Sequence, residues 1–134
     1  MQRRLTFDSE PILAFFLGEP GGETVSECLS KIQRKEMDGF ISVVNLAEVY
    51  YILYRLNPKL ADENCRALSQ VGLTAVPVED DDLWRNAAKT KAKHSLSLGD
   101  AFAVATAEKH KATLVVGNDS EFGGLNVKLL KIRA

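Results

Sequence analysis

The sequence has few cysteines and no hydrophobic run long enough to cross a membrane. Cys28 and Cys65 are the two cysteines of the 134-residue chain. They have neither metal-ligand spacing nor a second pair, which predicts reduced thiols in a cytoplasmic protein. The longest apolar runs, such as residues 40–44, fall far short of the roughly 20 residues of a membrane-spanning helix. The N-terminus also lacks the pattern of a signal peptide. We therefore expect neither a disulfide scaffold nor a membrane protein.

Nucleotide-binding motifs are also missing from the chain. It contains no Gly-x-Gly-x-x-Gly segment and no Gly-Lys-Ser/Thr loop, so a nucleotide cofactor is not indicated. The formal net charge of −1 argues against a protein that coats nucleic acid by bulk electrostatics. With 46% hydrophobic and 26% charged residues, the chain has the composition of an ordinary globular domain. Its length predicts one domain over residues 1–134.

Hydrophobic periodicity predicts an alternation of strands and helices. Short apolar runs predict strands at residues 5–7, 40–44, 73–78, 113–116 and 127–130. Apolar spacings of three and four, with helix-ending residues between them, predict helices at residues 9–17, 22–35, 45–56, 58–71, 80–94 and 98–110. Such an alternation is typical of a parallel sheet with helices on both faces. The predicted fold class is therefore α/β, a three-layer α/β/α sandwich with a central parallel sheet.

Four acidic residues stand where a predicted strand ends or a predicted helix begins. Asp8, Glu48 and Asp119 follow the ends of strands, and Asp100 begins the helix that leads into the strand at residues 113–116. Because crossovers in parallel sheets are right-handed and helices run back against the strands, all four fall at the carboxyl edge. Ligands of open α/β sheets bind in the crevice at that edge. Four carboxylates there would hold divalent cations.

Each acid also has an ordinary structural explanation. Asp and Glu are favoured near helix N-termini, where they cap backbone N–H groups and complement the helix dipole. The segments 97–100 and 45–48 both have the spacing of a capping box. For Asn45 we expect capping rather than a role in the crevice. A shared site is therefore indicated by the joint position of the four acids and not by any one of them.

Five segments, taken in order, resemble the PIN-domain nucleases and, within them, the small VapC-type toxins of toxin–antitoxin pairs. The matching segments are residues 7–9, 17–20, 42–49, 97–101 and 113–122. The resemblance implies a single PIN domain over residues 1–134. It also implies a metal-dependent endoribonuclease whose catalytic and metal-binding acids are Asp8, Glu48, Asp100 and Asp119.

Two positions depart from the family pattern. Glu10 stands where family members more often carry a small polar residue, and the last segment offers both Asp119 and Glu121 as the fourth ligand. We favour Asp119 because it is closer to the strand end, with Glu121 acting through water. Ligation by oxygen alone suits Mg²⁺ or Mn²⁺ better than Zn²⁺. Such ions stabilise charge on the attacking and leaving oxygens of a phosphodiester during hydrolysis.

Further polar residues are candidates for holding the substrate. Ser9 and Asn118 flank the acids and offer hydrogen bonds to water or phosphate. Arg85, Lys89 and Lys93 share one helix face, where they would guide RNA phosphates, since phosphate contacts position a nucleic acid without reading its sequence. The alternatives are turn formation for the two polar residues and a solvated helix face for the three basic ones.

The predicted helix at residues 45–56 has almost no polar face. Helices that are apolar all round are normally buried, so this one is either part of the core or an interface. The family resemblance implies both a homodimer and an antitoxin whose tail crosses the active-site groove. The same resemblance leaves an alternative function open, a catalytically inactive PIN-like module that binds RNA or protein. Metal-dependent RNA cleavage separates the enzyme from that module.

Overall fold

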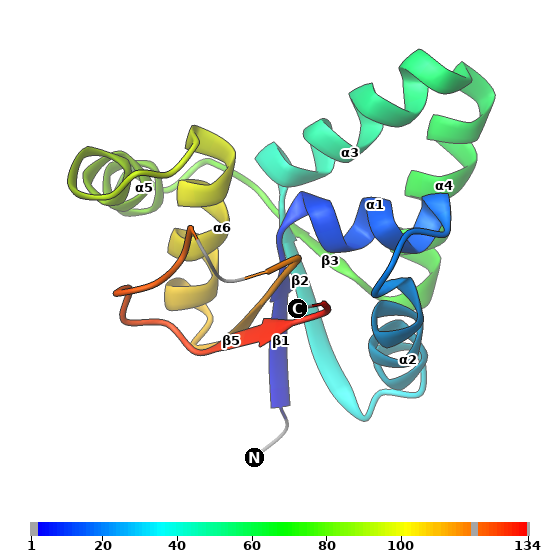
Figure 1. The fold of residues 1–134 in the computed structure, drawn as a ribbon, viewed down its shortest axis with the longest axis horizontal. Helices are drawn as coiled ribbons and strands as arrows, with labels where there is room; N and C mark the ends of the chain where they lie inside the picture. The colour runs from blue at the N-terminus through cyan, green and yellow to red at the C-terminus, as the bar shows by residue number, and fades with distance from the viewer. Residues whose placement is uncertain (1–2, 119–120, 134) are drawn as a thin grey trace.

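The protein folds around one parallel sheet. The computed structural model describes residues 3–118 and 121–133, and Figure 1 shows its arrangement. The strands are β1 (Arg3–Phe7), β2 (Met37–Ser42), β3 (Thr74–Val76), β4 (Thr113–Val116) and β5 (Leu129–Lys131). They join in the order β3-β2-β1-β4-β5, and every neighbouring pair is parallel. The predicted central parallel sheet is confirmed.

Helices cover both faces of the sheet. One face carries α1 (Ser9–Leu17), α2 (Gly22–Gln33), α3 (Val43–Leu56) and α4 (Pro58–Val71), and the other carries α5 (Asp81–Lys93) and α6 (Leu98–Lys109) (Figure 1). Successive residues of a strand point to opposite faces. Val115 accordingly packs into the core under α1 to α4, while Leu114 and Val116 pack with α6. The three-layer α/β/α sandwich is as predicted. No helix among residues 3–118 and 121–133 is long and apolar enough to cross a membrane.

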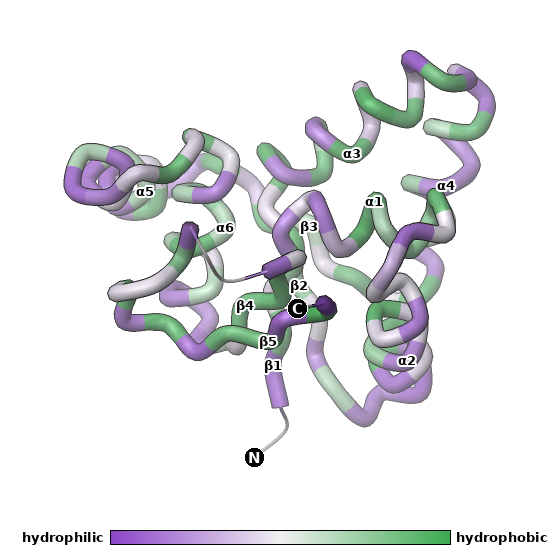
Figure 2. Tube along the Cα trace, viewed as in Figure 1, coloured by the Kyte–Doolittle hydropathy of each residue, from purple (hydrophilic) through white to green (hydrophobic). Residues whose placement is uncertain are grey.

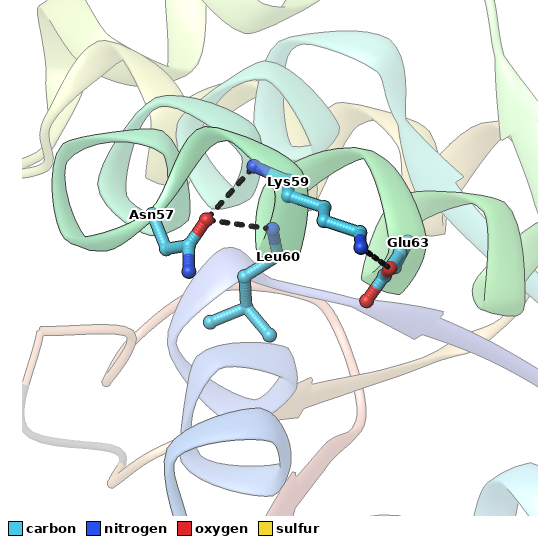
Figure 3. A network of polar contacts seen from close by, with 4 residues as sticks. All are labelled: Asn57, Lys59, Leu60 and Glu63. Atoms are coloured by element: carbon cyan, nitrogen blue, oxygen red, sulfur yellow. Dashed lines mark hydrogen bonds and ion pairs between the residues drawn. The ribbon is translucent and has the colours of Figure 1, made fainter.

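Amphipathic patterning and capping place the outer helices. Along α2 and α5, hydrophobic and hydrophilic residues alternate (Figure 2). Asn57 both ends α3 and begins α4, and its side-chain oxygen accepts from the backbone N–H groups of Lys59 and Leu60 at 3.0 and 3.4 Å. Lys59 also lies 3.9 Å from Glu63 one turn later (Figure 3). A side-chain cap of this kind stabilises a helix by about 1 kcal/mol, whereas an exposed ion pair adds little. The cap therefore fixes the start of α4 beside the end of α3.

The boundary between β2 and α3 differs from the prediction. Val43 and Val44 extend an apolar, β-branched run and were predicted to end the strand, but they begin α3. The Oγ atom of Ser42 accepts from the N–H of Val44 at 3.2 Å, which caps the helix two residues earlier than expected. Glu48 consequently lies in the second turn of α3 and not in its first. β2 also starts three residues earlier than predicted, and the remaining elements are found where predicted, with ends shifted by up to two residues.

The inner face of α5 is also not the predicted one. The apolar spacing predicts Trp84, Ala87, Ala88 and Ala92 on the buried side, yet all of them except Ala87 are exposed. The structure instead buries Leu83, Ala87 and Thr90 against α6. The indole N–H of Trp84 donates to Asp81 at 3.2 Å, which gives the ring a polar partner at the surface. The Trp84 ring thus lies outside the contact between α5 and α6, which Leu83, Ala87 and Thr90 fill.

Candidate active site

Asp8 lies at the centre of the carboxyl edge because it directly follows the central strand. Its backbone N–H donates to the carbonyl of Val115 at 3.0 Å, which ties it between β1 and β4. Its Oδ1 atom accepts from the N–H of Ser9 at 2.9 Å and so caps α1. The residue is 3% exposed. Capping and a place in the crevice are therefore compatible roles of one carboxylate.

Asn45 joins the acidic residues into one cluster. Its Nδ2 atom donates to Glu48 Oε1 at 3.0 Å, to the carbonyl of Gly99 at 3.0 Å and to Asp8 Oδ1 at 3.4 Å. The residue is completely buried. Because Ser42 caps α3, the prediction that Asn45 is a helix cap is wrong. Asn45 instead connects the end of β1, the second turn of α3 and the start of α6.

The first turn of α6 carries Asp100 and places Gly99 beside Glu48. Ser97 caps this helix by accepting from the N–H of Asp100 at 3.1 Å, as its capping-box spacing predicts. A Cβ atom built on Gly99 would lie 2.5 Å from Glu48 Oε2, closer than atoms can approach. The glycine therefore leaves the room that the Glu48 carboxyl group occupies beside the start of α6. Glu48 and Asp100 are both half-buried.

Burial and acidic neighbours both disfavour the charged form of the Asp8 carboxyl group. Burial raises the pKa of Asp8 well above its usual value, and the charge of Asp100 raises it further. The hydrogen bond from the Ser9 N–H lowers the pKa, while the charges of Glu48 and Glu10 raise it. A bound cation would relieve this repulsion, because an opposite charge favours the ionised form of each carboxyl group.

Glu121 approaches the cluster from the segment after β4. The charge of Asp100, together with a side-chain hydrogen bond between the two groups, raises the pKa of Glu121. Asp119, the favoured fourth ligand, lies outside the described residues. Ser9 is half-buried beside Asp8, and Asn118 is exposed. Of the four predicted acids, the structure therefore brings Asp8, Glu48 and Asp100 together.

Glu10 is a further carboxylate of the crevice that sequence reasoning noted only as a departure. A Cβ atom on Gly117 would lie 2.5 Å from the Glu10 carboxyl group, so Glu10 packs against the end of β4. Arg133, which follows β5, forms an ion pair with it. The two residues are 123 positions apart. No local pattern in the sequence indicates their contact.

The groups at this edge suit a hard divalent cation. Among residues 3–118 and 121–133, the side chains found around Asp8 are the carboxylates of Glu10, Glu48 and Asp100 and the amide of Asn45, a set that favours Mg²⁺ or Mn²⁺ over Zn²⁺ as a bound ion. The Oδ1 atom of Asn45 is buried without a hydrogen-bond partner among the described groups. Within residues 3–118 and 121–133, no three acidic, His or Cys side chains already form a metal cage. Asp8, Glu48 and Asp100 are the groups that would hold the ion.

The predicted basic residues lie on the outer layer. Arg85, Lys89 and Lys93 are all exposed on α5, which packs against α6. The guanidinium of Arg85 lies over the ring of Trp84, 5.2 Å from its centre. These residues are accessible to a ligand, but the structure does not bring them into the carboxylate cluster.

The chain matches a protein-family model over most of its length. The family model for the PIN domain matches residues 5–127. Among proteins with curated functions, none matches the chain.

Solved structures with the same fold include several toxin–antitoxin complexes. The chain is 19% identical to a component of a toxin–antitoxin complex from Klebsiella pneumoniae, with a TM-score of 0.75 over 96% of this chain and 97% of the other. For VapBC2 from Rickettsia felis bound to a promoter DNA fragment, identity is 15% and the TM-score 0.72, over 96% and 98% of the chains. Mycobacterium tuberculosis VapC20, a toxin that cleaves the sarcin–ricin loop, is 17% identical with a TM-score of 0.68, over 92% and 98%. At these identities the likeness shows the fold.

Proposed function

The chain belongs to the PIN-domain family, and from this membership we propose that it is a metal-dependent endoribonuclease, the toxin of a type II toxin–antitoxin pair. It would hydrolyse phosphodiester bonds of RNA. The observation that carries the proposal is that the buried Asn45 amide donates to both Asp8 and Glu48, while Asp100 lies close enough for its charge to act on Asp8. The RNA-cleaving toxin among its structural neighbours supports the choice of substrate class.

In this proposal the acids hold Mg²⁺ or Mn²⁺, and other side chains of the protein position the acids and the attacking water. Asp8, Glu48, Asp100 and Asp119 are the ligands. When bound there, such an ion would supply stabilisation of the charge on the attacking and leaving oxygens of the phosphodiester. Asp100 or Glu48 orients the attacking water and accepts its proton, because both are half-buried and so can reach solvent, whereas Asp8 is enclosed. The Asn45 amide fixes Asp8 and Glu48 by donating to both.

The substrate would be held by groups on both sides of the crevice. Ser9 and Asn118 flank the acids, and we assign them hydrogen bonds to the scissile phosphate or its water. Arg85, Lys89 and Lys93 would contact phosphates farther along the RNA, since they are exposed on α5. Contacts of that kind steer and position RNA but do not read its sequence.

RNA cleavage by the purified protein tests the proposal. We expect cleavage of a mixed RNA pool with Mg²⁺ or Mn²⁺, none with EDTA, and a loss of at least about 100-fold in Asp100→Asn, because a ligand of the ion is removed. Asp82→Asn is the matched control, since Asp82 occupies the first turn of α5 as Asp100 does that of α6. A folded, Mn²⁺-binding protein that cleaves neither RNA nor single-stranded DNA would instead favour the inactive PIN-like binding module.

The proposal includes two protein partners. The interpretation of residues 45–56 as a purely internal helix is wrong, because Tyr51, Tyr54 and Leu56 are 46%, 52% and 63% exposed. We assign this part of α3 to a second copy of the chain. Antitoxins accompany the toxins in several structural neighbours, which supports a cognate antitoxin here. The proposal also includes a cytoplasmic location, which suits the free thiols of Cys28 and Cys65.

A further inference from the structure

Arg133 connects three segments at one end of the carboxylate crevice. Its backbone N–H donates to the carbonyl of Gly117 at 3.2 Å, continuing the pairing of β5 with β4. Its Nη1 atom donates to the carbonyl of Pro20 at 3.2 Å, in the turn between α1 and α2. Its Nη2 atom pairs with Glu10 in the first turn of α1. The guanidinium is therefore fixed in place by contacts on both sides.

The carboxylate that Arg133 holds belongs electrostatically to the crevice. Glu10 lies against Gly117, where even a methyl group would collide with it. It lies in the first turn of α1, two residues after Asp8, and contacts the residue that follows β4, so it stands at the same carboxyl edge as the cluster. Without a cationic partner, Glu10 would add a full negative charge to the cluster. It would then compete with the other carboxylates for any divalent ion.

We propose that Arg133 is a positioning residue that neutralises Glu10 and holds it against Gly117, so that a divalent cation in the crevice is left to Asp8, Glu48 and Asp100. This inference rests on the cation site of the proposed function. It assigns a role to a residue outside all five segments that resemble the family. It also explains how the chain tolerates Glu10 at a position where a small polar residue is usual.

The pair differs from an ordinary surface ion pair in its surroundings. The Arg133 and Glu10 side chains are 28% and 49% exposed, so the difference lies in the arginine, both of whose Nη atoms have acceptors. In the Arg34–Glu36 pair, at the far end of α2, the side chains are 57% and 52% exposed. Surface pairs contribute little to stability. A side-chain charge interacts twice as strongly with a divalent cation as with a monovalent one at the same distance. Removing one charge of this pair should therefore change the affinity for the cation.

Mn²⁺ binding to the metal-stripped full chain, followed by calorimetry, tests the role. Arg133→Met leaves the charge of Glu10 unbalanced, and we expect Mn²⁺ to bind about two- to tenfold more tightly. Glu10→Gln leaves the charge of Arg133 unbalanced, and we expect weaker binding by a similar factor. The double variant restores the net charge of the pair and should bind within about twofold of the wild type. Opposite signs in the single variants are a signature that a merely structural role does not produce.

Control variants separate the local effect from total charge and from folding. Arg34→Met makes the same charge change on the remote exposed pair and should leave Mn²⁺ affinity unchanged. Arg133→Lys keeps the charge while losing the planar fork, and we expect affinity close to that of the wild type. If Arg133→Met does not fold, Glu10→Gln and Arg133→Lys still carry the test.

The outcomes distinguish this inference from the function on which it rests. Equal Mn²⁺ affinity in wild type, Arg133→Met and Glu10→Gln overturns the role of Arg133 and leaves the cation site standing. A shift of the same sign in both single variants also overturns it. A wild-type chain that binds no Mn²⁺, with binding equally absent in Asp100→Asn, overturns the cation site itself and the role of Arg133 with it.

Discussion

The side-chain amide of Asn45 donates to Glu48 Oε1 at 3.0 Å from a position three residues earlier in α3. The same nitrogen also faces Asp8 Oδ1 and the carbonyl of Gly99, so every neighbour it meets is an acceptor. The amide is buried, and its other end has no partner among the described groups. Asn45 is therefore needed at this position as a donor, and a residue of the same shape without the N–H groups would not replace it.

Asn45→Asp is the variant that tests this requirement. It replaces the donor by an acceptor among three acceptors, and we expect the free energy of unfolding at pH 7 in EDTA to fall by about 3 kcal/mol. Urea denaturation measures the change. Asn86→Asp is the matched control, because Asn86 is an exposed residue of α5, and it should cost less than about 0.5 kcal/mol. Equal losses in the two variants would contradict the donor role.

The raised pKa of Asp8 predicts a stability that depends on pH. Because the folded-state pKa lies above the usual value of 3.8, ionising Asp8 costs stability as the pH rises through the folded pKa. Asp8→Asn removes this cost and keeps the acceptor that caps α1. In EDTA the variant should therefore melt at a higher temperature than the wild type at pH 7 to 8, by at least about 2 °C.

The advantage of Asp8→Asn should shrink as the pH falls toward 3.8, because below that value the wild-type carboxyl group is mostly protonated in both the folded and the unfolded chain. Thermal melts from pH 4 to 8 give the comparison. A difference that does not vary with pH would mean that packing, and not ionisation, separates the two proteins.

Gly99→Ala should separate activity from stability. The new methyl group would meet the Glu48 carboxyl group, which can swing away at little cost to the fold but not without losing its place. We expect RNA cleavage to fall at least about tenfold, while the free energy of unfolding changes by less than about 1 kcal/mol. Gly123→Ala is the control, since nothing lies within 4 Å of a Cβ there. Cleavage by Gly99→Ala at the rate of this control would contradict the close approach of Glu48.

The exposed end of α3 predicts self-association. Tyr54 is 52% exposed and stacks on Tyr50, with ring centres 5.9 Å apart. We expect the wild type to sediment as a dimer and Tyr54→Lys to raise the dissociation constant at least about tenfold, because a charge would replace an apolar contact. Trp84→Lys serves as the control, as Trp84 is a comparably exposed aromatic residue on α5. A wild-type chain that is monomeric at all concentrations would contradict the assignment of this part of α3 to a second copy.

The sequence predicts the edge at which the site lies, but not every boundary around it. The placement of Asp8 and Asp100 follows from the handedness of parallel crossovers, which needs no coordinates. Val43 and Val44 cause the wrong strand boundary, because β-branched residues favour strands. The helix cap formed by the Ser42 hydroxyl outweighs that preference. Recognising Ser42 as the cap would also have freed Asn45 for the crevice, because the two positions are three residues apart.

Other features of the site have no local signal at all. Glu10 and Arg133 meet only because β5 pairs beside β4 and brings the end of the chain to the start of α1. Local periodicity cannot indicate a contact between residues so distant. The prediction for Asp119 lies outside the described residues and stays a prediction.

The position of β1 in the sheet determines when the crevice can assemble during protein synthesis. β1 is the first strand of the chain, yet it lies between β2 and β4, and Leu5 pairs with Thr113. On a ribosome, one edge of β1 therefore stays unpaired until β4 has emerged. Contacts between such distant residues form late in folding. A nascent chain thus carries Asp8 for most of its synthesis without the partners that surround it in the finished fold.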